Sequence, residues 1–86
     1  MNYRAEIRVM LKPSILDPQG RAVEGALHRL GTTNVTDVRI GKHLTLTLSG
    51  ERAEVEVQLE QLIEEVLSNP VMEHAHYTLT ELAAQE

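Results

Sequence analysis

The chain has 86 residues, of which 42% are hydrophobic and 24% charged, so we expect one small folded domain over residues 1–86 with a frayed tail at 83–86. Cysteine is absent, which excludes disulfides, thiolate metal sites and thiol nucleophiles. The net charge is -5 and the aromatic residues are Tyr3 and Tyr77 alone, so a nucleic-acid-binding surface is not expected. No apolar run approaches the ~20 residues of a membrane span, and we expect a cytoplasmic protein without a membrane partner.

Charge is distributed unevenly along the chain. Residues 1–50 hold seven basic and four acidic side chains, whereas residues 51–86 hold nine Glu against Arg52 alone. This asymmetry is typical of a solvated acidic helix and tail, and it also fits a docking face for a basic partner.

The first half of the chain predicts a strand and a helix. Apolar residues alternate with polar ones from Tyr3 to Leu11, which indicates a half-buried strand that Pro13 ends. Asp17 and Pro18 are typical of the N-cap and first position of a helix, predicted over Pro18–Leu30 with Gly31 after it. Its apolar stripe, which we expect to face a core, consists of Val23, Ala26, Leu27 and Leu30.

Residues 35–48 allow two interpretations. Val38, Ile40, Leu44, Leu46 and Leu48 all occupy even positions, so parity fits either one long bent strand or a hairpin that turns near 41–43. We favour the hairpin, because Gly41 suits a turn and a single strand of that length would be unusual.

The second half predicts another helix and strand. A helical apolar period runs over Arg52–Leu67 and ends before Pro70. Alternation returns at about Glu73–Leu82, with His74 and His76 on one face and Tyr77 on the other.

The predicted order is strand, helix, strand, strand, helix, strand. It indicates an α+β ferredoxin-like β-α-β-β-α-β sandwich, an antiparallel sheet with two helices on one face. The other face of the sheet would be open, with Arg4, Glu6, Arg8 and Met10 beside residues such as Thr45, Thr47, His76 and Thr78. Such a face is a common dimer surface, or it faces water.

Motifs for catalysis are weak throughout. His74 and His76 have the spacing of two metal ligands on a strand, but no third ligand accompanies them, and we predict no metal site. No serine lies in a nucleophile elbow, and the glycines form no phosphate-binding loop. We therefore predict no catalytic and no cofactor-binding residue in this chain.

Two segments, residues 14–20 and 37–42, contain residue patterns that suggest a specific structural or binding role. The first is explained by a hydrophobic staple with its helix cap, or else by a recognition loop. The second is explained by charges at a strand edge, or by a bidentate arginine contact to a partner. The candidate interaction residues are Asp17, Gln19, Arg39 and Lys42.

These blocks resemble the PurS family, the small subunit of bacterial phosphoribosylformylglycinamidine synthase. The resemblance rests on residues 11–20, on Ala22, Val23, Ala26 and Leu27, and on residues 37–42 and 67–73, which together cover nearly the whole chain in the family's order. The sequence departs from the family pattern after Glu73, at His74, Ala75 and His76.

The resemblance implies a non-catalytic subunit of de novo purine biosynthesis. It implies a homodimer or homotetramer that bridges the synthetase large subunit (PurL) and the glutaminase subunit (PurQ) and helps ammonia pass between them. ATP and Mg would belong to the synthetase partner. Two alternatives from other classes are a ligand-sensing regulatory domain and a small metal-dependent hydrolase that uses His74 and His76.

Overall fold

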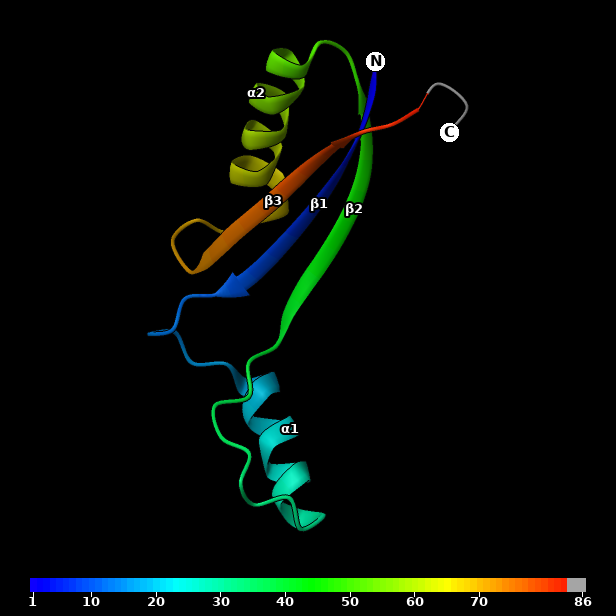
Figure 1. Cartoon of the computed structure of the whole chain (residues 1–86). Helices are drawn as coiled ribbons and strands as arrows, with labels where there is room; N and C mark the ends of the chain where they lie inside the picture. The colour runs from blue at the N-terminus through cyan, green and yellow to red at the C-terminus, as the bar shows by residue number, and fades with distance from the viewer. Residues whose placement is uncertain (84–86) are drawn as a thin grey trace.

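The computed structural model describes residues 1–83, which form three strands and two helices (Figure 1). In chain order they are β1 (Asn2–Leu11), α1 (Pro18–Arg29), β2 (Gly41–Ser49), α2 (Arg52–Leu62) with a π-helical last turn at Ile63–Leu67, and β3 (Glu73–Glu81). The predicted bounds of both helices and of the first and last strands are confirmed to within one residue. No helix among the described residues is long and apolar enough to cross a membrane.

The sheet is antiparallel, with β1 in the centre and the strand order β2-β1-β3. The ferredoxin-like arrangement is confirmed in this order, because the first strand of that fold lies between the last strand and the third. The fourth strand of the full sandwich, which would extend the sheet beyond β2, does not form in residues 1–83.

The core lies between the sheet and α2. Tyr3, Ala5, Ile7 and Val9 of β1 are almost fully buried on one face, as the period of two predicts. Val55 and Leu59 of α2 pack against them, with exposed fractions of 1% and 0%. The other face of the sheet is open and carries the polar set, with Arg4 opposite Thr47 and Thr80 and Glu6 opposite Thr45 and Thr78.

The second helix ends in a wider turn. Ser68 donates from both its backbone N–H and its hydroxyl to the carbonyl oxygen of Ile63, at 3.0 and 2.7 Å. The N–H bond spans five residues and defines the π-helical turn. Pro70 then prevents continuation, and the chain turns into β3.

The hairpin predicted at 35–48 is wrong. Residues 32–40 form an irregular connection, and a single strand begins at Gly41. The reason lies in tertiary contacts: side chains from α1 and its cap take the backbone N–H groups of Val38 and Ile40, which a strand would have used in a ladder.

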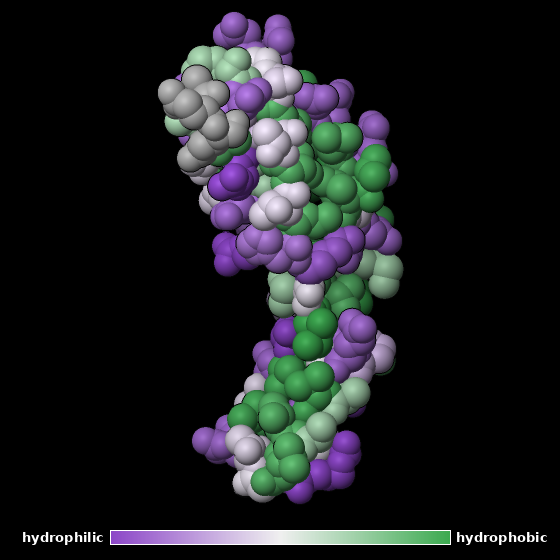
Figure 2. All heavy atoms as spheres, turned by 90° about the vertical axis from the view of Figure 1, so that its right-hand side faces the viewer, coloured by the Kyte–Doolittle hydropathy of each residue, from purple (hydrophilic) through white to green (hydrophobic). Residues whose placement is uncertain are grey.

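The first helix also departs from expectation, because it extends beyond the end of the sheet as an arm (Figure 1). Gly20 is its only buried residue. Val23 is 39% exposed and Leu30 82% exposed, so the apolar stripe does not face a core within this chain. Figure 2 shows hydrophobic surface along this arm. Among residues 1–83, α2 is the helix that covers the sheet.

Candidate functional site

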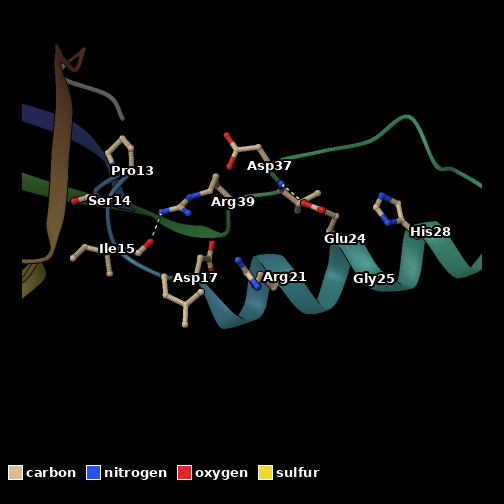
Figure 3. A pocket seen from close by; sticks show the side chains of 12 residues that line it. Pro13, Ser14, Ile15, Asp17, Arg21, Glu24, Gly25, His28, Asp37 and Arg39 are labelled. Atoms are coloured by element: carbon tan, nitrogen blue, oxygen red, sulfur yellow. Dashed lines mark hydrogen bonds between the residues drawn. The ribbon is translucent and has the colours of Figure 1, made fainter.

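The two segments that the sequence singles out, residues 14–20 and 37–42, lie together where α1 leaves the sheet. We call this meeting point the junction; it consists of residues 12–20 and 35–40. A cavity of about 750 Å³ opens beside it, shown in Figure 3. Side chains of α1, among them Arg21, Glu24 and His28, border it on the side that faces Asp37 and Arg39.

Asp17 is the central residue of the junction. Its Oδ1 accepts a hydrogen bond from the Gly20 N–H at 2.9 Å, which confirms the predicted N-cap. Its Oδ2 accepts another from the Ile40 N–H at 2.7 Å. The carboxylate is buried, and the hydrogen bonds from Gly20 and then Ile40 hold the pKa of Asp17 below its ordinary value of 3.8 against the opposing effect of desolvation.

Arg39 ties the two segments from the other side. Its Nη2 donates to the carbonyl oxygens of Lys12 and Ile15, at 3.0 and 2.9 Å. The guanidinium points at the turn after β1 in Figure 3, and its positive charge also lowers the pKa of Asp17. Arg39 therefore has an intramolecular role, and a contact with a partner stays a prediction.

The rest of the connection is held to α1 by two further side chains. Glu24 Oε1 accepts from the Val38 N–H at 3.1 Å, and His28 Nε2 lies 2.7 Å from the Val35 carbonyl oxygen. His28 is half-buried. Between these contacts Asp37 adopts a left-handed backbone with φ 55°, which Asp tolerates better than most residues.

Gly20 explains why the helix starts with the sequence Asp-Pro-Gln-Gly. A Cβ at this position would clash with the Val38 carbonyl oxygen and with the Asp17 carboxylate. The missing side chain lets the first turn of α1 lie directly against the connection. This close approach was not foreseen from the sequence, although a glycine in the first turn of a helix is a signal for it.

The remaining candidates are exposed. Gln19 and Lys42 lie on the surface, with Lys42 opposite Val9 on the helix side of the sheet. Both border a hollow of about 290 Å³ that also includes Leu11 and Ile40. Leu16 is 62% exposed, so the hydrophobic-staple interpretation fails for this residue.

His74 and His76 lie on the open face of β3, as predicted from their spacing. Among residues 1–83 no group of three or more His, Asp or Glu side chains could hold a metal ion. The two imidazoles have no third ligand of these types among residues 1–83, so the described residues offer no metal site for the hydrolase alternative.

The sequence model of the family described as PurS, phosphoribosylformylglycinamidine (FGAM) synthase, matches residues 4–81. The chain belongs to the PurS family. A curated relative, the PurS subunit of phosphoribosylformylglycinamidine synthase from Bacillus subtilis, is 41% identical over 83 residues, covering 96% of this chain and 99% of its own. The PurS subunit of Mycobacterium leprae is 46% identical over 70 residues, covering 81% of this chain and 86% of its own.

Solved PurS structures share the fold. A crystal structure of B. subtilis PurS has a TM-score of 0.85 at 40% identity, covering 92% of this chain and 99% of that one. A chain in the structure of PurLQS from Thermotoga maritima has a TM-score of 0.82 at 25% identity, covering 92% and 98%. The family expected from residues 11–20 and 37–42 is thereby confirmed, and the junction is where these two PurS blocks meet in space.

Proposed function

We propose that this chain is the small, non-catalytic assembly subunit of phosphoribosylformylglycinamidine synthase in the cytoplasm. It bridges the glutaminase and synthetase subunits in de novo purine biosynthesis and supports the transfer of ammonia between them. The observation that carries the proposal is the PurS match over residues 4–81, together with the likeness to a chain of the PurLQS structure.

The geometry supports a role in which the surface of this chain binds other subunits. The polar contacts of Asp17 and Arg39 are made within the chain, and they join the start of α1 to the connection that leads into β2. An arm held in one direction presents its side chains to another subunit at little entropic cost, since the ordering is already done. ATP and Mg are assigned by this proposal to the synthetase partner.

The arm also supports a homodimer or a higher homo-oligomer of this single-domain chain. Val23 and Leu30 leave an apolar stripe on α1 uncovered, and the hollow of about 290 Å³ leaves the nearby end of the sheet uncovered. A second copy that lays its α1 on this end of the sheet would cover both surfaces at once, in two symmetric contacts. The molecule is 50 Å long but only 15 Å thick, so one copy alone has little interior.

Reconstitution tests the bridging role. The purified chain is mixed with its cognate synthetase and glutaminase, and FGAM formation is followed with glutamine and, separately, with ammonium as nitrogen donor. We expect the glutamine-dependent rate to require the chain and the ammonium-dependent rate to depend on it much less. Equal glutamine-dependent rates with and without the chain would refute the proposal.

A further inference from the structure

A row of three basic side chains crosses the open face of the sheet. Arg8 of β1 is paired in register with His43 of β2 on one side and with His76 of β3 on the other. Directly opposite residues on neighbouring strands have Cβ atoms about 4.5–5.5 Å apart. Each histidine is therefore an immediate cross-strand neighbour of Arg8, and all three side chains are exposed.

The row borders a hollow of about 300 Å³, which is also lined by Glu6, Tyr77 and Thr78. This hollow lies on the face opposite α2, away from the junction. Its size is enough for a small anion with its hydration, and the Thr78 hydroxyl is a further hydrogen-bond donor.

Arg8 has no partner for its charge within residues 1–83. The only ion pair between side chains in this part of the chain joins Arg52 and Glu56, and no side-chain hydrogen bond involves Arg8. Glu6 lies on the same face one row away but makes no ion pair with it. Among the residues that line the hollow, Arg8 therefore offers five guanidinium N–H donors that no described side chain uses.

We propose that the row formed by His43, Arg8 and His76 binds a phosphate group. A guanidinium presents two parallel donors that match two oxygens of a tetrahedral dianion, and an imidazole on either side can donate to the remaining oxygens. The carboxylate of Glu6 repels an anion, and the permanent positive charge of Arg8 offsets this repulsion. The site uses the open face only, so it is independent of the proposed contacts of α1.

The first experiment titrates the full chain with inorganic phosphate and, in parallel, with ribose 5-phosphate, and follows the side-chain NMR signals of Arg8, His43 and His76. We expect saturable shifts with a dissociation constant of about 1 mM or below for the preferred ligand. Tighter binding of inorganic phosphate indicates the free ion as the ligand, and tighter binding of ribose 5-phosphate indicates a phosphorylated metabolite.

Arg4 provides a matched control. It lies on the same strand and the same face, but its neighbours are Thr47 and Thr80 in place of two histidines. We expect Arg8→Ala to weaken binding about tenfold or more and Arg4→Ala to change it less than about twofold. Equal losses in the two variants would show general attraction to a basic surface and overturn the site.

A double variant isolates the contribution of the two imidazoles. The charged and titratable groups on this face are Arg4, Glu6 and Arg8 of β1, His43 of β2, and His74 and His76 of β3. The double variant His43→Gln and His76→Gln keeps Arg8 and removes both flanking imidazoles. We expect it to weaken phosphate binding about threefold or more at constant pH.

Three results would overturn the proposal: no saturation in the wild-type chain, phosphate binding unchanged in the histidine double variant, or a change of oligomeric mass in Arg8→Ala by light scattering. The last result would assign the row to an interface between copies of the chain. Circular dichroism confirms that each variant is folded, and all three basic side chains are exposed, so their replacement should leave the core intact.

Discussion

Asp17 and Ile40, which are 23 residues apart, are joined by a hydrogen bond of 2.7 Å from the backbone N–H of Ile40 to the Asp17 carboxylate. The same carboxylate caps α1, so one side chain both starts the helix and fastens it to the segment that leads into β2. The direction of the arm is therefore set by a polar contact at its base, with little packing along its length.

Replacing Asp17 should show how much the junction depends on this contact. Asp17→Ala removes both acceptors and leaves the N–H groups of Gly20 and Ile40 without their partner. We expect the melting temperature to fall by roughly 5 °C or more. Gln19→Ala, at an exposed neighbouring position, is the control and should change it little. Similar melting temperatures for the two variants would contradict the assignment.

The charge of Asp17 should also make the stability depend on pH. Because the pKa of Asp17 in the folded chain lies below its ordinary value of 3.8, the ionised carboxylate favours the folded state. This stabilisation is present above pH 3.8 and is lost as the pH falls through the lower folded value. In Asp17→Asn this component of the acid sensitivity should disappear. Urea unfolding from neutral pH to about pH 2.5 measures it, and identical slopes in wild type and variant would refute it.

Replacement of Gly20 and of Gly25 by alanine, both on α1, should change the stability in opposite directions. Gly20→Ala places a Cβ against the Val38 carbonyl oxygen, so we expect a loss of about 1–3 kcal/mol as the connection is displaced. At Gly25 the nearest atom to an added Cβ is the flexible Arg29 guanidinium at 3.4 Å. Gly25→Ala should therefore stabilise the helix by about 0.5–1 kcal/mol. Chemical denaturation measures both, and equal signs would contradict the close approach at Gly20.

Arg39 is predicted to stabilise the junction directly and to affect assembly through the junction. Arg39→Ala leaves the Lys12 and Ile15 carbonyl oxygens without their donor, so amide hydrogen exchange in residues 18–29 should become faster while the sheet is unchanged. Binding to the synthetase and glutaminase should weaken at the same time. Lys42→Ala, which removes an exposed charge, should leave exchange unaffected. Unchanged exchange in Arg39→Ala together with weakened binding would instead indicate a direct contact between Arg39 and a partner.

The sequence predicts the regular elements well because their signals are local. The alternation from Tyr3 to Val9 defines β1, and Asp17 with Pro18 defines the start of α1. The prediction of a hairpin is wrong for two reasons. Val38 and Ile40 have the same even-numbered spacing as the apolar residues of β2, so they look like part of a strand. Their backbone N–H groups, however, donate to Glu24 and Asp17, which are distant in sequence. Periodicity predicts that a face is apolar, but it does not say what covers that face. The stripe on α1 therefore predicts a core, whereas residues 1–83 leave Val23 and Leu30 exposed.

The last prediction concerns that stripe. If a second copy covers α1, Leu30→Asp and Val23→Asp should both shift the molecular mass from that of an oligomer toward the 9.6 kDa monomer. Leu30 is 82% exposed, so its replacement should leave the isolated fold intact. Val57→Asp is the matched control, because Val57 is a 58% exposed valine on α2, away from the arm. Light scattering measures the mass and circular dichroism the fold; an unchanged oligomer in both α1 variants would refute α1 as the dimer contact.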